Sequence, residues 1–229
     1  MGEDSIEQED DVTDLAELKQ RVIEGEQELA VALTQAAIAA GCSADTVFQQ
    51  ALFPAMDVVG QRMQAQEYFI PEVLLAARAM QACAALLRPL IVRDLTVKPI
   101  GTVVACTVSG DLHDIGKNLV CLMLEGAGFT IVDLGNNCPP DKVVEAVRRH
   151  APEIVVLSAM LTTTMLNMRA VIDALNAAGL RQRVHVMVGG APVDAKFARE
   201  IGADSYSDDA PGASTEARKH MEAVTSHPR

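Results

Sequence analysis

The sequence contains no tryptophan, and aromatic residues make up only 3% of its 229 residues. Hydrophobic residues nevertheless reach 49%, so we expect an aliphatic core with much helix. No uncharged apolar run reaches the length of a membrane span, and no signal peptide opens the chain. These absences predict a cytoplasmic protein with no membrane partner.

Paired cysteine motifs are also missing. The five cysteines are scattered and none stands in CxxC spacing, which argues against a disulfide framework or a structural zinc site. We therefore expect reduced thiols, mostly in apolar segments. The five positions are Cys42, Cys83, Cys106, Cys121 and Cys138.

Basic residues are too few to balance the acids, and the formal net charge is −12. This excess of negative charge argues against a nucleic-acid partner. Residues 3–17 hold eight acids and no base. Because such a segment cannot bury enough apolar surface, we expect residues 1–12 to form a flexible acidic tail.

The first part of the chain, residues 13–93, is rich in Ala, Leu, Gln and Glu, with apolar residues at helical spacing. Gly41 is typical of a helix end, Ser43 of an N-cap and Pro71 of a first turn. The pattern predicts a helical bundle. Its four helices are expected at residues 13–24, 26–40, 44–66 and 70–93.

A linker is expected at residues 94–100, which include Pro99, and beyond it the periodicity changes. Short apolar strands then alternate with amphipathic helices through residues 101–229. This predicts a Rossmann- or flavodoxin-like domain, a five-stranded parallel sheet with helices on both faces. Strands are expected at residues 101–108, 130–134, 153–159, 183–189 and 204–207, and helices at 117–127, 140–150, 165–178, 193–201 and 211–224.

The run Gly110-Asp111-Leu112-His113-Asp114-Ile115-Gly116 directly follows the first of these strands. Ser158-Ala159-Met160 ends the third strand, and Gly189-Gly190 ends the fourth. Parallel strands bring their carboxyl ends to one edge of the sheet, where ligands bind in open α/β folds. The sequence therefore predicts a cofactor site centred on His113.

These D-x-H-x-x-G, S-x-M and G-G elements resemble the cobalamin-binding domain shared by methionine synthase, corrinoid methyl carriers and B12-dependent mutases. Met160 stands where that family usually has Leu, a conservative change. The resemblance extends to the bundle, where Met56-Asp57-Val58-Val59-Gly60 and Phe69-Ile70-Pro71 look like the helical cap of methionine synthase. Together it covers nearly all of residues 13–224.

The resemblance implies that His113 is the axial ligand of cobalt and replaces the cofactor's own benzimidazole, the base-off/His-on state. Asp111 would accept a hydrogen bond from the other ring nitrogen, with the Thr164 hydroxyl beyond it. Met63 and Ile70 match lid residues above the corrin, although the family has an aromatic residue at the position of Met63. Further cofactor contacts are implied for Gly110, Leu112, Asp114, Ile115, Gly116, Ser158, Met160, Thr162, Gly189, Gly190 and Ala210.

Two neighbours of the motif have simpler interpretations. Asp114 is expected to cap the helix that follows, and Lys117 to be a solvated residue of its first turn.

The functional prediction is a methyl carrier that is not an enzyme on its own. The resemblance implies a cap and a cobalamin domain, and no remaining segment is long enough for the substrate barrels of methionine synthase or the mutases. The implied partners are a substrate:corrinoid methyltransferase, a second methyltransferase acting on tetrahydrofolate or a thiol, and an ATP-dependent reductive activase. Methanol, methylamine, betaine and aryl methyl ethers are the methyl donors of such systems.

Two other functions remain open at this point. A B12-dependent sensor would need a DNA-binding head, for which only the acidic residues 1–12 are available. A flavodoxin-like nucleotide-binding or phospho-receiver domain would lack the G-x-G-x-x-G turn and the usual acidic cluster on its first strand.

Overall fold

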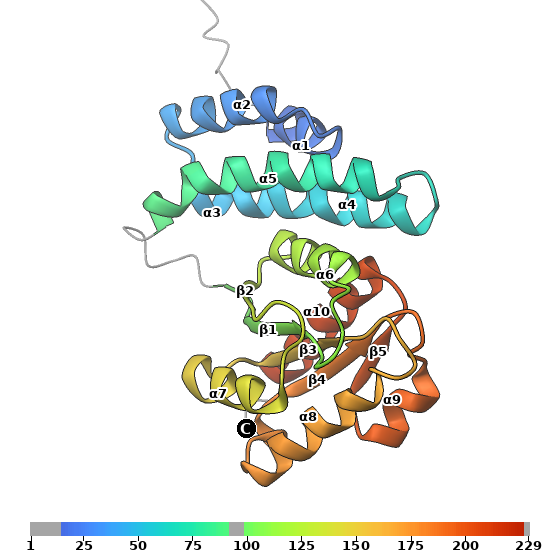
Figure 1. Ribbon diagram of the computed structural model, residues 1–229. Helices are drawn as coiled ribbons and strands as arrows, with labels where there is room; N and C mark the ends of the chain where they lie inside the picture. The colour runs from blue at the N-terminus through green and yellow to red at the C-terminus, as the bar shows by residue number, and fades with distance from the viewer. Residues whose placement is uncertain (1–14, 92–98, 227–229) are drawn as a thin grey trace, which may run out of the picture.

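A computed structural model describes residues 15–91 and 99–226 of the protein. A helical bundle lies above an α/β domain, and helix α6 (Ile115–Gly126) lies between the bundle and the sheet (Figure 1). The acidic tail predicted for residues 1–12 and most of the linker predicted at residues 94–100 lie outside the described residues.

The bundle contains α1 (Leu15–Ile23), α2 (Gln27–Ala39), α3 (Ala44–Val47), α4 (Phe53–Gln64) and α5 (Ile70–Ile91). Gly41 has a φ of +83°, and Ser43 Oγ accepts a hydrogen bond from the Thr46 amide, as predicted for a helix end and an N-cap. The single helix predicted over residues 44–66 is interrupted by a π-helical turn at Phe48–Leu52. This wider turn directly precedes Pro54, whose nitrogen cannot donate the hydrogen bond that a regular α-helix requires.

Helix α5 is long and apolar enough over Ile70–Leu87 to cross a membrane, judged by length and composition alone. In the structure it is a bundle helix, since Val73, Ala77, Met80 and Leu87 are buried in the bundle core. Its apolar character is therefore explained by packing within the protein.

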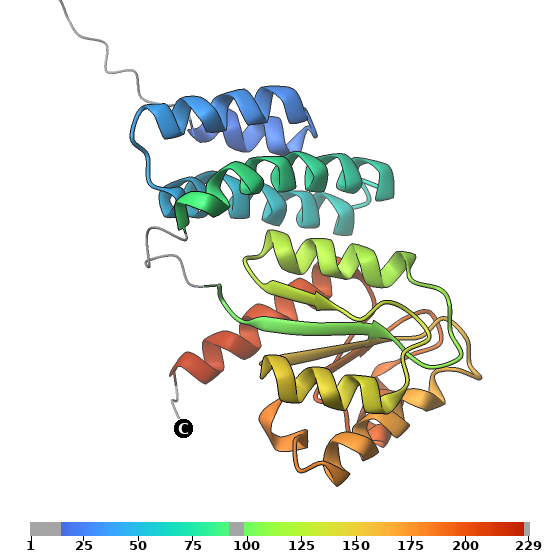
Figure 2. The same ribbon diagram turned by 60° about the vertical axis from the view of Figure 1, so that its left-hand side comes forward.

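The α/β domain has the predicted architecture, five parallel strands in the order β2-β1-β3-β4-β5. Helices α6 and α10 cover the face toward the bundle, and α7, α8 and α9 cover the other face (Figures 1 and 2). The strands are β1 (Thr102–Thr107), β2 (Thr130–Asp133), β3 (Ile154–Ser158), β4 (His185–Gly189) and β5 (Ser205–Ser207), and the remaining helices are α7 (Pro140–His150), α8 (Leu166–Ala177), α9 (Ala195–Ile201) and α10 (Ala210–Ser226).

Alternate residues of the central strands face the two helical layers. Val103 and Val156 pack with Leu124 of α6, whereas Val104 and Leu157 pack with the layer on the opposite face. Because both faces are covered, both sets of residues must be apolar, which accounts for the continuous apolar runs.

Helix α6 begins at Ile115, two residues before the predicted start. Asp114 occupies the N-cap position, but its side chain makes no capping hydrogen bond. Its Oδ2 accepts a hydrogen bond from Asn136 Nδ2 at 3.1 Å instead. The predicted cap is thus wrong, because a side chain of the neighbouring loop competes for the carboxylate.

The bundle packs closely on α6 and α10. A Cβ atom on Gly60 would lie 2.9 Å from Met123 Cε, and one on Gly126 would lie 2.7 Å from Met56 Cγ. These two glycines therefore allow the methionines to interlock.

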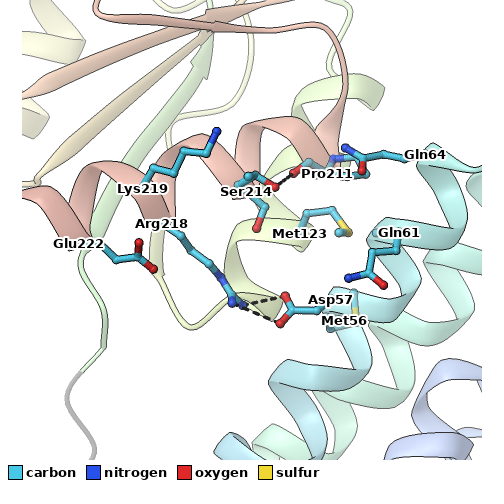
Figure 3. Close-up of a pocket in the computed structure, with 12 residues that line it drawn as sticks. Met56, Asp57, Gln61, Gln64, Met123, Pro211, Ser214, Arg218, Lys219 and Glu222 are labelled. Carbon is cyan, nitrogen blue, oxygen red and sulfur yellow. Dashed lines mark hydrogen bonds and ion pairs between the residues drawn. The ribbon is translucent and has the colours of Figure 1, made fainter.

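Beside these apolar contacts, α4 and α10 border a polar pocket of about 300 Å³ (Figure 3). Across it, Arg218 binds Asp57 with both guanidinium NH2 groups, at 2.9 and 3.2 Å. A further hydrogen bond of 3.0 Å joins Gln81 to Glu125. The interface thus combines an interlocked apolar part with a polar edge.

Candidate functional site

The predicted motifs meet at the carboxyl edge of the sheet, where the strand order reverses between β1 and β3. Ser158 of β3 pairs in register with Thr107 of β1 on one side and with Gly189 of β4 on the other. Gly189 pairs in turn with Ser207 of β5. These four residues form one row across the sheet, at the position where open α/β folds bind ligands.

His113 is held by the buried carboxylate of Asp111. Its Nδ1 lies 2.8 Å from Asp111 Oδ1, and its backbone amide donates to the same oxygen at 3.0 Å. The other oxygen accepts hydrogen bonds from the Met160 amide at 2.7 Å and from Thr164 Oγ1 at 2.5 Å. The order histidine, carboxylate, hydroxyl is the one that the resemblance implied.

Electrostatics keep the Asp111 carboxylate ionised. Burial alone would raise its pKa, because Asp111 is fully inaccessible to solvent. The hydrogen bonds from Thr164, from the Met160 and His113 amides and from the His113 ring outweigh burial, and the pKa lies well below its usual value. With Nδ1 donating to this carboxylate, Nε2 is the ring nitrogen left to bind a metal.

Asparagines outside the motif hold its loop in place. Gly110 has a φ of +79°, and its amide donates to Asn137 Oδ1 at 2.8 Å. Asn167 Nδ2 donates to the Ser109 carbonyl at 2.7 Å, and Thr107 Oγ1 donates to the His113 carbonyl at 3.1 Å. The histidine is therefore fixed by its loop before any ligand binds.

Next to this loop, a cavity of about 260 Å³ opens between the sheet edge, α6 and α10. A Cβ on Gly116 would meet no atom within 4 Å, so a side chain there would enter open space beside the cavity. Gly189 and Gly190 allow close backbone approach, since a Cβ on them would lie 2.8 Å from the Ser207 carbonyl oxygen and 1.9 Å from that of Ala159. The lining includes Met63, Gly116, Lys117, Leu119, Val120, Val156, Ser158, Met187, Gly189, Gly190, Ser207, Asp208, Asp209, Ala210 and Ala213.

Lys117 is not the solvated residue that the sequence predicted. Its side chain is completely buried, and Nζ lies 2.5 Å from Asp133 Oδ2 and 2.6 Å from Asn118 Oδ1. Because a buried ammonium group requires a partner, the carboxylate at the end of β2 accounts for its position.

The other predicted contacts divide into three groups. Met63, Gly116, Ser158, Gly189, Gly190 and Ala210 line the cavity. Leu112 and Met160 are exposed on the two loops that carry and support His113, and Ile115 is exposed at the start of α6. Thr162 and Ile70 are also exposed and are not among the residues that line the cavity, although Thr164 is buried against Asp111.

Sequence reasoning missed Lys117, the supporting asparagines and Ser207. Lys117 of α6 pairs with Asp133 of β2, and Ser207 of β5 joins the row beside Gly189 of β4. Strand register rather than local pattern would have been needed to find them. The sequence does contain one usable signal, since Ser207 ends the last strand just as Ser158 ends the third.

The residues present fit a corrinoid cofactor. A histidine with one ring nitrogen fixed by a carboxylate has its other nitrogen free to serve as a ligand for cobalt. The adjacent cavity, with glycines at its edge and apolar walls, provides a slot beside that ligand.

Comparison with known proteins agrees with this fit. Residues 101–215 match the family model of a B12 binding domain, and residues 14–88 match a second B12 binding domain. The trimethylamine corrinoid protein of Methanosarcina barkeri is 39% identical over 197 residues, which cover 86% of this chain and 91% of that relative.

Two solved structures are similar along most of the chain. A cobalamin-binding protein from Desulfitobacterium hafniense is 32% identical, with a TM-score of 0.76 over 90% of this chain and 98% of that one. A chain of the methanol:cobalamin methyltransferase complex from Methanosarcina barkeri is 31% identical, with a TM-score of 0.82. The match covers 91% of this chain and 79% of that one. The chain belongs to the family of B12-binding, methyl-carrying corrinoid proteins.

Proposed function

We propose that the protein carries a methyl group on cobalamin from a substrate-specific methyltransferase to a second methyltransferase that acts on tetrahydrofolate or a thiol. The observation that carries this proposal is the Thr164–Asp111–His113 chain of hydrogen bonds beside the cavity. Bound cobalamin supplies a cobalt centre that can accept and release a methyl group.

The protein's own residues have separate tasks in this proposal. His113 is the axial ligand in the base-off/His-on state, and Asp111 fixes its tautomer and orientation. Ser158, Gly189 and Gly190 border the slot for the displaced nucleotide tail, together with Gly116 on α6. Met63 of the bundle lines the same cavity, and we assign it to the cover that would keep water from the cofactor.

A trimethylamine corrinoid protein among the relatives and a methanol:cobalamin methyltransferase complex among the similar structures support methylamines or methanol as the methyl source. An amine or alcohol carbon must be activated before methyl transfer, and we assign that step to the partner methyltransferase. An ATP-dependent reductive activase completes the system by restoring the most reduced cobalt state.

The test mixes reduced holo-protein with methanol, methylamines, betaine or an aryl methyl ether under anaerobic conditions. Absorbance of the bound cofactor reports methyl transfer with and without an added substrate-specific methyltransferase. We expect transfer from one donor class and only with the partner present. Rapid transfer from an unactivated donor without any partner would contradict the carrier function.

His113→Ala provides the matched variant. It should still bind cobalamin through the slot, but the electron paramagnetic resonance spectrum of its cobalt(II) form should lack the histidine nitrogen splitting. His150→Ala, on the last turn of α7, should keep that splitting. A spectrum of the unaltered protein that shows intact benzimidazole coordination would contradict the His-on state.

A further inference from the structure

We propose that Ser207 determines which corrinoid the protein prefers, by hydrogen bonding to a polar group on the lower base of the nucleotide tail. This inference rests on the proposed binding of a corrinoid and adds a preference among corrinoids with different lower bases. Ser207 ends β5, lines the cavity and has a side-chain oxygen that is closed off from solvent. Among the described residues, this oxygen has no hydrogen-bond partner.

The strand register places Ser207 on the side of the sheet that faces the cavity. Met187 of β4 pairs with Ser205 and packs toward α6 and α10. Since side chains alternate along a strand, Ser207, two residues further on, belongs to the same face. The serine oxygen moves with a single torsion, so the hydroxyl can turn into the cavity without backbone movement.

Gly189 lies between two serines in this row, Ser158 on one side and Ser207 on the other. Neighbouring strands are about 4.8 Å apart, so the two serines stand about 9 to 10 Å apart across a position without a side chain. A flat ring lying over Gly189 would therefore have a hydroxyl at each end. The family resemblance implies that Ser158 contacts the nucleotide tail. The contact from Ser207 is inferred from the structure alone.

The surroundings of Ser207 indicate the chemistry of the group that it contacts. Leu119, Val156 and Met187 make most of the cavity wall apolar, as suits the faces of an aromatic base. The end formed by Ser207 and Asp208 is polar and offers oxygen acceptors. This end favours a base with a hydrogen-bond donor on its outer edge, a hydroxyl or exocyclic amine, over one with methyl groups there.

Equilibrium binding of three corrinoids to the full-length protein tests the inference. They are cobalamin, whose base carries two methyl groups, its analogue with a 5-hydroxybenzimidazole base, and cobinamide, which has no nucleotide tail. We expect the unaltered protein to bind the hydroxylated corrinoid about fivefold more tightly than cobalamin, the factor for one net hydrogen bond. Ser207→Ala should abolish this preference, and Ser207→Thr should retain it.

Cobinamide binding should be equal in all three proteins, and thermal melting of the proteins without cofactor shows whether each variant is folded. Equal affinity of the unaltered protein for both tailed corrinoids, or an unchanged preference in Ser207→Ala, would overturn the role of Ser207 alone. Failure of the unaltered protein to bind any corrinoid would overturn the proposed function as well.

Discussion

At the scale of single residues, the fully buried Asp111 is the centre of the site, because four hydrogen bonds converge on its two oxygens. Three of the donors come from the His113 ring and from two backbone amides. Only Thr164 contributes a side chain from the opposite loop that can be removed without altering the histidine. It therefore offers a direct measure of how strongly the carboxylate is held.

Thr164→Val should lower the free energy of unfolding of the protein without cofactor by about 2 kcal/mol, since it removes a hydrogen bond to a buried charge. Thr162→Val is the matched control, because Thr162 is exposed two residues away on the same turn. That control should change stability by less than about 0.5 kcal/mol. Urea denaturation of both variants measures the difference, and equal effects would contradict this account of Asp111.

The Lys117–Asp133 pair should respond unequally to the loss of either partner. Asp133→Ala leaves the fully buried ammonium group unpaired and should destabilise the protein by about 3 kcal/mol. Lys117→Met leaves a carboxylate that already reaches solvent, so its effect should be clearly smaller. Denaturation midpoints of the two variants measure this difference in stability. A larger loss of stability in Lys117→Met than in Asp133→Ala would contradict the account of Lys117 as the buried partner that needs the carboxylate.

The residues of the site were predicted from sequence to different degrees. His113, Asp111 and Thr164 are hydrogen-bonded in the order that the resemblance implied, and their roles toward the cofactor stay a prediction. Lys117 was misplaced, since its partner Asp133 lies 16 residues away on β2, whereas Lys117 lies on α6. Local patterns do not show which side chain will meet an ammonium group after folding.

At the scale of elements, the strands and helices of the α/β domain follow the expected pattern, with boundaries that shift by a few residues. The alternation of apolar strands and amphipathic helices was sufficient to predict these elements, because the central strands β1, β3 and β4 are covered on both faces. The start of α6 and the π-helical turn before Pro54 were not predicted. Both depend on backbone hydrogen bonds, for which side-chain periodicity carries little information.

Two glycines of α6 provide a contrast between packing and helix propensity. Gly126→Ala should destabilise the protein without cofactor by about 1–3 kcal/mol, because the added methyl would lie 2.7 Å from Met56 Cγ. The methyl group added by Gly116→Ala would have no atom within 4 Å, so this variant should stabilise the same helix by about 0.5–1 kcal/mol.

Thermal melting of both variants without cofactor tests this contrast. Gly116→Ala should in addition weaken cobalamin binding, because its methyl group enters the space beside the cavity. Equal stability of the two variants would mean that the bundle does not press on α6 as described.

At the scale of the whole molecule, the contacts of the bundle with α6 and α10 determine how readily the two separate. Under the proposed function, this separation would let a partner reach the bound cofactor. The Asp57–Arg218 ion pair is partly exposed, so its contribution is modest, about 0.5–1 kcal/mol. Either Asp57→Asn or Arg218→Gln should therefore raise the open population about twofold to fivefold. The charge-swapped double variant Asp57→Arg with Arg218→Asp should restore the closed population.

Distances between spin labels on α2 and α9 measure the open fraction in these full-length variants. High salt should reduce the difference between the single variants and the unaltered protein, since the pair is screened. An open fraction that is the same in all variants at low salt would show that the ion pair does not hold the bundle closed.

The bundle and α6 share one apolar core, in which Leu119 and Met123 pack with Met56 and the bundle's other buried residues. Separating them exposes this apolar surface to water, so the open form of the isolated protein has a higher free energy and a tendency to associate with other apolar surfaces. A methyltransferase that presents its own apolar surface there would reduce this penalty, whereas an unrelated protein would not. Under the proposed function, the contacts that cover the cofactor would thus also select the partner, because the bundle would separate readily only for a protein able to replace the displaced helices.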